Sequence, residues 1–134
     1  MNAESVFLDT NVLIYAYSDD DTIKQYKARS VLFAHSCIIS TQVLTEFSNI
    51  AFKKLHLPAS EINSTISVLS GLCSVHVVDK ITIQKAVDIK ARYEYSFYDS
   101  LMIASAIECK CSFLYSEDMA DGHVINSLMI RNIF

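Results

Sequence analysis

Glycine and proline are nearly absent from this chain, with two glycines and one proline among 134 residues. So little of either argues against disorder and against long irregular loops. The two glycines, Gly71 and Gly122, also form no glycine-rich cradle for phosphates, which excludes a nucleotide-binding enzyme of that type. Because 51% of the residues are hydrophobic, the chain has ample material for one core. We expect a single domain over residues 1–134.

An excess of basic residues is also missing, since 11 Lys and Arg stand against 15 Asp and Glu, for a net charge of −4. This balance argues against a nucleic-acid binder that relies on a broad basic surface, but it permits an acidic centre that holds a metal. No apolar run approaches the roughly 18 residues of a membrane span, and the first five residues lack the basic start of a signal peptide. We therefore expect a cytoplasmic protein that does not contact a membrane.

Cysteine and histidine are present but sparsely patterned. The four cysteines form no C-x-x-C pair, and the four histidines show no zinc spacing. In a cytoplasmic protein such cysteines are most simply reduced. Cys109 and Cys111 leave a metal or redox pair as a minor alternative.

Short apolar runs alternate with amphipathic segments along the chain. We expect strands at residues 6–8, 37–39, 75–78 and 113–115, with a fifth strand within residues 124–133. Helices are expected over about 21–34, after Ser40, from Pro58, around 83–90 and after Tyr98. This alternation predicts an α/β fold with three layers, α/β/α, around a central, mostly parallel sheet of about five short strands.

Four carboxylates, Asp9, Glu46, Asp99 and Asp118, stand at strand ends or early in helices. Asp9 opens a polar Asp-Thr-Asn turn after the first strand and Asp118 follows the fourth, which places both at the edge where parallel sheets carry active sites. Apolar residues bound each of the four closely, and an unpaired buried charge costs several kcal/mol. A cation would stabilise such a cluster, and oxygen ligands favour Mg²⁺ or Mn²⁺. The pattern predicts a metal-dependent hydrolase.

Each carboxylate taken alone has an ordinary structural explanation. Asp99 would serve as a helix N-cap, Asp9 would close an Asx turn, and Glu46 would be a solvated helix residue paired with Lys53. The joint occurrence of all four, in an order that lets them converge, favours the metal site.

The segments around these residues resemble the PIN-domain family. Residues 8–15 match its Asp after the first strand, residues 40–46 its helical Glu, residues 98–106 its Asp opening an apolar helix, and residues 116–118 its Ser/Thr-x-Asp motif. The matches keep the family's order over nearly the whole chain. Single-domain members of this size are often VapC-type toxins. The resemblance therefore implies a ribonuclease that binds an antitoxin protein and forms a homodimer.

Roles follow for the individual residues. Asp9 and Asp99 are the leading metal ligands, Asp118 is the next, and Glu46 either ligates a second ion or orients the attacking water; all four are expected to be catalytic. In two-metal hydrolysis of a phosphodiester the ions lie roughly 3.5–4 Å apart. Thr10 and Asn11 are expected to hold the Asp9 carboxylate or a metal-bound water, and Ser116 is expected to play a similar part near Asp118. Asp121 is an optional fifth acid, whereas Glu117 is expected to face solvent.

Two other classes of protein that place acidic residues on a parallel sheet fit these residues less well. A dehalogenase-like phosphatase needs a second Asp where Asn11 stands, and a phosphoreceiver domain needs a late-strand Lys that is not evident. The remaining alternative is a catalytically inactive PIN-like module that binds RNA or protein, and the presence of all four carboxylates disfavours it. We expect a Mg²⁺- or Mn²⁺-dependent endoribonuclease that hydrolyses RNA, the toxin of a toxin–antitoxin pair.

Overall fold

A single sheet runs through the middle of the protein, in a computed structural model that describes residues 4–134. Within this range six strands are hydrogen-bonded in the order β3-β2-β1-β4-β6-β5. Their bounds are β1 Ser5–Leu8, β2 Ser36–Ser40, β3 Ser74–His76, β4 Phe113–Tyr115, β5 Val124–Ile125 and β6 Leu128–Arg131. All neighbouring strands are parallel except β5 and β6, which pair antiparallel.

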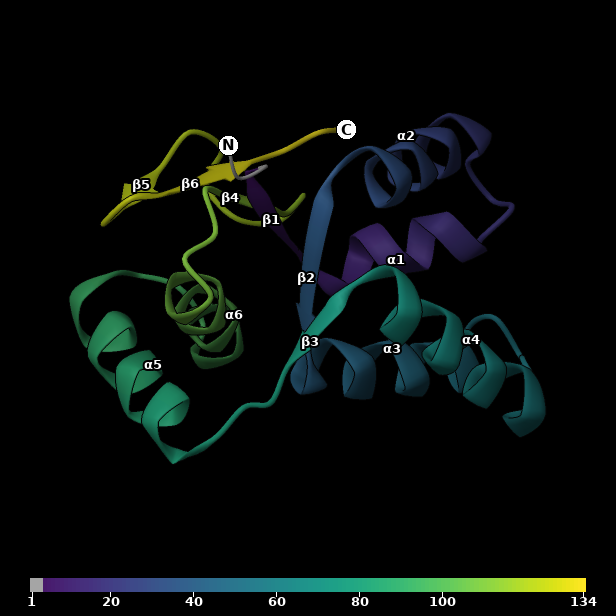
Figure 1. Cartoon of the computed structure of the whole chain (residues 1–134), viewed down its shortest axis with the longest axis horizontal. Coiled ribbons are helices and arrows are strands. Elements are labelled where there is room, and N and C mark those ends of the chain that lie inside the picture. Colours follow the sequence, from purple (N-terminus) through teal and green to yellow (C-terminus); the bar gives the residue numbers. More distant parts are fainter. Residues whose placement is uncertain (1–3) are drawn as a thin grey trace.

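Helices cover the sheet on both faces. Within residues 4–134 they are α1 Thr10–Tyr17, α2 Thr22–Ala34, α3 Thr41–Lys53, α4 Ala59–Leu72, α5 Lys80–Arg92 and α6 Phe97–Glu108. The chain moves outward from β1 to β2 to β3 and then returns past β1 to β4. Because crossovers between parallel strands are right-handed, this reversal puts α1–α4 on one face and α5 and α6 on the other, as Figure 1 shows. The predicted three-layer α/β/α fold with a mostly parallel sheet is confirmed.

The differences from the expected elements are local. The segment predicted to hold a fifth strand contains two, because the chain reverses at Asn126, which adopts a positive φ of 54°, so the sheet has six strands. The turn predicted after β1 is wrong, since α1 begins at Thr10 with Asp9 as its N-cap. The third strand ends at His76, two residues earlier than expected.

The core is built where the central strands meet helices from both faces. β1 buries Val6, Phe7 and Leu8 in succession, as expected for a strand covered on both sides. α6 is buried over seven consecutive residues from Ser100 to Ala106, so it is held firmly under the sheet. This rigid packing fixes the carboxyl ends of β1 and β4, which flank the point where the strand order reverses.

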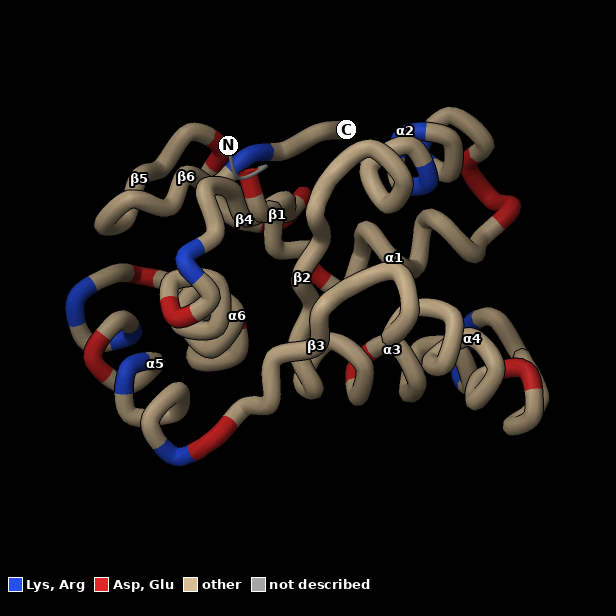
Figure 2. Tube along the Cα trace, in the orientation of Figure 1, with Lys and Arg blue, Asp and Glu red and all other residues tan. Residues whose placement is uncertain are grey.

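Charge is distributed unevenly over this frame. Lys and Arg gather on α2 and along α5, whereas acidic residues also occur near the middle of the molecule, where β2 meets α1 and on α3 (Figure 2). No helix in the described part of the chain is long and apolar enough to cross a membrane.

Candidate active site

A cavity of about 260 Å³ opens where the strand order reverses, beside the carboxyl end of β1. Ligand sites in doubly wound sheets occupy this position. Four carboxylates that the sequence singled out meet here, although they come from segments up to 109 residues apart, between position 9 and position 118. The lining residues are Asp9, Thr10, Asn11, Glu46, Asn49, Ile50, Asp99, Met102 and Asp118.

Asp9 lies at the bottom of the site and is the most buried of the four, with 6% of its surface exposed. It caps α1, and its Oδ1 accepts a hydrogen bond of 2.6 Å from the backbone N–H of Thr10. Its Oδ2 accepts one of 2.8 Å from the hydroxyl of Ser116. Burial, partly offset by these hydrogen bonds and reinforced by the charges of Asp99 and Glu46, raises the pKa of Asp9 to about 6. The carboxylate is thus held firmly in a place that disfavours its own negative charge.

Glu46 reaches the cavity from α3, whose first turn is capped by Ser40 as predicted. The hydroxyl of Thr10 donates a 2.7 Å hydrogen bond to Glu46 Oε1, and the amide of Gln42 donates one of 3.3 Å to Oε2. Pairing with Lys53 is therefore not the arrangement found. Thr10 supports two carboxylates at once, because its backbone binds Asp9 and its side chain binds Glu46.

Asp99 projects from the first turn of α6, but it is not the N-cap. Ser96 is the cap, and its hydroxyl accepts a hydrogen bond of 3.1 Å from the backbone N–H of Asp99. The Asp99 carboxylate lines the cavity, and the helix N-terminus favours its charge. Burial and the neighbouring charge of Asp118 raise the pKa of Asp99 above its usual value, and interaction of the carboxylate with the Ser96 side chain offsets part of this rise.

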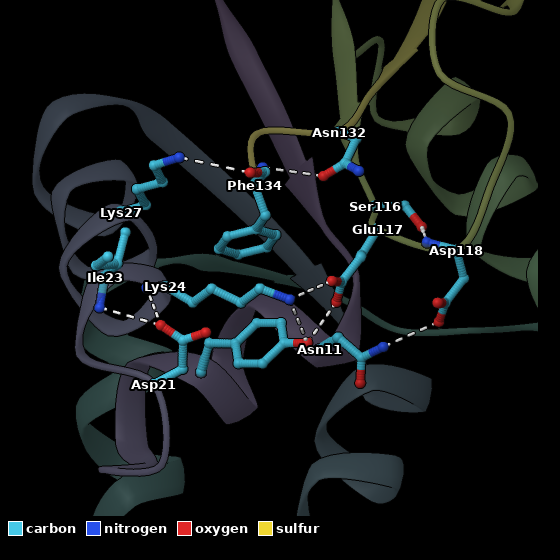
Figure 3. Close-up of polar contacts among 11 residues, drawn as sticks. Asn11, Asp21, Ile23, Lys24, Lys27, Ser116, Glu117, Asp118, Asn132 and Phe134 are labelled. Atoms are coloured by element: carbon cyan, nitrogen blue, oxygen red, sulfur yellow. Dashed lines mark hydrogen bonds and ion pairs between the residues drawn. The ribbon is translucent and has the colours of Figure 1, made fainter.

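Asp118 follows β4 and completes the lining. Its Oδ2 accepts a 2.9 Å hydrogen bond from the side-chain amide of Asn11 (Figure 3). Its backbone N–H and that of Met119 both donate to the Ser116 hydroxyl, at 3.3 Å each. The support that we expected from Asn11 thus goes to Asp118, while Asp9 is held by Ser116 and by the backbone of Thr10.

Two acidic residues near Asp118 lie elsewhere. Asp121 is exposed, does not line the cavity, and accepts a 3.0 Å hydrogen bond from the backbone of Asn132, so it secures the chain after β6. The expectation that Glu117 faces solvent is wrong, because only 24% of its side chain is exposed and it forms an ion pair with Lys24.

Sequence reasoning missed several residues of the cavity wall. Asn49 lies one turn beyond Glu46 on α3, and Met102 lies three residues beyond Asp99 on α6, so both share a helix face with a predicted carboxylate. Gln42, one turn before Glu46, also donates to the carbonyl of Tyr98 at 3.0 Å and so links α3 to α6. The i±3 and i±4 neighbours of the two helical acids were the signal that could have found them.

The chemistry of these side chains suits a hard divalent cation. Four carboxylates line one cavity, and oxygen-only ligation is the preference of Mg²⁺ and Mn²⁺. Burial raises the pKa values of Asp9 and Asp99 most, and the neighbouring carboxylates add to this; a cation bound in the cavity would favour the charged form of both groups. Within residues 4–134, no three His, Cys, Asp or Glu side chains are gathered closely enough to form a ready-made metal centre. Thr10 and Asn11 hold oxygens of Glu46 and Asp118 by hydrogen bonds.

The family model of the PIN domain matches residues 6–120, which include all four carboxylates. The chain belongs to the PIN-domain family. No curated protein matches the chain in sequence.

Solved structures share the fold across nearly the whole chain. A toxin–antitoxin complex from Klebsiella pneumoniae matches with a TM-score of 0.72 and 21% identity, covering 92% of this chain and 95% of the other. VapC20 of Mycobacterium tuberculosis, a toxin that cleaves the sarcin–ricin loop, matches with a TM-score of 0.69 and 18% identity over 84% and 89% of the two chains. VapBC2 from Rickettsia felis, bound to a promoter DNA fragment, matches with 0.70 and 16% over 96% and 98%.

Proposed function

We propose that this single-domain protein is a Mg²⁺-dependent endoribonuclease, with Mn²⁺ as a substitute, and that it is the toxin of a toxin–antitoxin pair. One observation carries the proposal: Asp9, Glu46, Asp99 and Asp118 line a single cavity at the point where the strand order reverses. Membership of the PIN-domain family supports nuclease chemistry, and the fold shared with VapC20 and VapBC2 supports the toxin role.

The contacts of each residue suggest whether it binds the metal or supports a residue that does. Asp9 and Asp99 are the leading metal ligands, because Asp9 follows β1 as the most buried carboxylate of the cavity and Asp99 lines the same cavity from the first turn of α6. Asp118 is the next ligand, and Glu46 completes the set or orients the attacking water. A bound divalent ion would supply charge neutralisation at the scissile phosphate and an acidified water as the nucleophile. Thr10, Asn11 and Ser116 hold the carboxylates in place, which preserves their aim towards the cavity.

The test is cleavage of total cellular RNA by the purified protein, with mapping of the ends, in Mg²⁺ and in EDTA. We expect cleavage in Mg²⁺ alone, and a loss of several orders of magnitude in Asp9→Asn and Asp99→Asn. Asp88→Asn is the matched control, since Asp88 is an exposed carboxylate on α5 that lines a different cavity. Cleavage that persists in Asp9→Asn, or a metal-independent wild type, would contradict the proposal. A protein that binds RNA without cutting it would support the inactive PIN-like module instead.

Protein partners complete the proposal: a cognate antitoxin whose segment covers the acidic cavity, and a second copy of the chain in a homodimer. Apolar side chains more than half exposed support protein partners, namely Ile23, Tyr26 and Phe33 on α2, and Val77, Ile81 and Val87 on and before α5. The mean hydropathy of +0.28 is consistent with apolar surface reserved for contacts. A strict monomer in light scattering at tens of micromolar (roughly the range expected of an interface of standard size) would contradict the homodimer. Harmless expression without an antitoxin would contradict the toxin role.

A further inference from the structure

Three consecutive side chains after β4 each bind a different residue of α1 or its N-cap, and one of them also binds α2. Ser116 donates to Asp9, and Glu117 accepts from the hydroxyl of Tyr15 and the ammonium of Lys24. Asp118 accepts from Asn11, and Figure 3 shows this bond beside the one between Lys24 and Glu117. Within residues 4–134, Lys24–Glu117 is the only ion pair between a Lys or Arg and a carboxylate. The position of this pair, directly beside a candidate catalytic residue, therefore needs an explanation.

One face of α1 receives both acidic residues of this segment. Asn11 and Tyr15 are four residues apart, so they lie one above the other on the helix. Asn11 binds Asp118 and Tyr15 binds Glu117, so neighbouring residues of the segment have neighbouring partners on the helix. A shift of Glu117 would consequently move Asp118 with it.

Lys24 closes this arrangement from α2. Its ammonium lies 4.7 Å from the centre of the Tyr15 ring and 5.7 Å from that of Phe134, and these two rings meet edge to face at 4.9 Å. Figure 3 shows the lysine passing beside the Phe134 ring as it extends to Glu117. Aromatic rings on either side of its side chain restrict where the ammonium can go.

We propose that Lys24 is a positioning residue of the candidate active site. By binding Glu117 it fixes residues 116–118 against α1, and it keeps the negative charge of Glu117 from adding to the four carboxylates of the cavity. The inference rests on the proposed function, since it takes Asp118 as part of a nuclease centre. Without Lys24, a freed Glu117 would stand beside Asp118 as a like charge and would compete with it for the same cations.

The chain offers variants that separate this role from a general effect on α2. Lys24→Met removes the charge but keeps the N-cap of α2, because Asp21 binds the backbone N–H of Lys24 and not its side chain. Lys24→Arg keeps the charge. Lys85→Met on α5 is the control for loss of a lysine charge, since Lys85 is exposed and lines a different cavity. Glu117→Gln, alone and combined with Lys24→Met, removes the charge that the lysine neutralises.

The first measurement needs neither metal nor RNA. Hydrogen exchange in EDTA follows the backbone amides of Asp118 and Met119, which bind the Ser116 hydroxyl. We expect peptides covering residues 116–119 to exchange faster in Lys24→Met, and at the wild-type rate in Lys24→Arg and Lys85→Met. Unchanged exchange in Lys24→Met would overturn the positioning role.

The second measurement is RNA cleavage as a function of Mg²⁺ concentration. Lys24→Met should lower kcat about tenfold and raise the Mg²⁺ concentration needed for half-maximal activity, as loss of an outer partner of a metal ligand does. KM for RNA should stay within about twofold, since only catalytic geometry changes. Adding Glu117→Gln should restore part of the lost kcat. A double variant as slow as the product of the two single losses would overturn the role of the freed charge.

Failure of the inference and failure of the proposed function give different results. Normal cleavage by Lys24→Met with a wild-type requirement for Mg²⁺ would overturn Lys24 as a positioning residue and leave the nuclease proposal intact. Absence of cleavage by the wild type would overturn the nuclease proposal and with it the catalytic part of the inference, while hydrogen exchange would still decide whether Lys24 orders residues 116–118.

Discussion

At Asp9, burial opposes the negative charge that metal binding requires. Asp9 must be an anion to bind a cation, yet only 6% of its surface is exposed, and burial disfavours that anion. The hydrogen bonds from Ser116 and Thr10 offset this cost in part. A residue kept in such a place at a cost in stability is typical of functional sites.

This cost leads to a prediction about pH for the metal-free protein. Because the pKa of Asp9 is raised from 3.8 to about 6, the folded state binds more protons than the unfolded state between these values. Its contribution to stability is therefore greatest below about pH 4 and is lost as the pH rises to about 6. Asp9→Asn should recover about 1–3 kcal/mol at pH 7.5 and almost none at pH 4.

Urea unfolding of both proteins in EDTA at several pH values measures this difference. The asparagine side chain of the Asp9→Asn variant can still accept from the Thr10 backbone, so the cap is retained. A constant offset between the two stability curves, independent of pH, would mean that Asp9 is not destabilised by its charge in the fold.

The N-termini of α1 and α6 position Asp9 and Asp99, and the two helices are capped in different ways. α1 starts at Thr10 because Asp9 caps it, so the same carboxylate serves the helix and the cavity. In α6 the two tasks are divided, since Ser96 caps the helix and Asp99 lines the cavity. Replacing Asp99 therefore tests the site without removing a cap.

Removal of the Ser96 cap should lower both the stability of the protein and its cleavage rate. Ser96→Ala should cost about 1 kcal/mol of stability, because the N–H of Asp99 loses its partner. Fraying of the first turn would also loosen Asp99, so we expect a several-fold lower cleavage rate. Urea unfolding and cleavage assays on the same preparation measure the two effects.

Ser70→Ala on α4 is the control for this substitution. The Ser70 hydroxyl only donates to the carbonyl of Ile66 within its own helix, so the change should alter stability by no more than about 0.5 kcal/mol. Equal costs for the two substitutions would argue against Ser96 as a cap that matters.

At the scale of the molecule, the reversal of strand order brings four distant segments to one cavity. β1 and α1 supply Asp9, α3 supplies Glu46, α6 supplies Asp99, and the segment after β4 supplies Asp118. Helices on both faces of the sheet thus contribute to a single acidic centre (Figure 1). Stability of the whole fold should therefore respond to a cation that binds there.

Thermal and chemical unfolding with and without Mg²⁺ tests this link. At a hundredfold excess over its dissociation constant, Mg²⁺ should stabilise the wild type by about 2.7 kcal/mol. Asp99→Asn should gain much less from Mg²⁺, and in EDTA it should be at least as stable as the wild type, because a repelling charge is gone. Asp88→Asn should respond as the wild type does. Equal Mg²⁺ shifts in wild type and Asp99→Asn would remove Asp99 from the metal site.

Local signals determined much of the fold. The alternation of short apolar runs with amphipathic segments gave the layers, the mostly parallel sheet and helices α2 to α6, because these depend on periodicity and capping within a few residues. Helix α1 was not predicted, because it buries Thr10, Val12, Leu13 and Ala16 between the sheet and neighbouring helices and its sequence therefore lacks a polar face. The antiparallel β5–β6 hairpin depends on Asn126, whose φ is positive, and the hydrophobic pattern of the neighbouring residues does not indicate this backbone conformation.

The sequence by itself also singled out four carboxylates that line one cavity, because their positions after strands and early in helices follow from the order of elements. Only the tertiary structure decided their partners. Asn11 binds Asp118 across 107 positions and Ser116 binds Asp9 across the same separation, and Lys24 binds Glu117 across 93. Such pairings depend on how helices pack on the sheet. Periodicity describes the face that a residue presents to its own element, but it carries no information about which distant side chain meets that face.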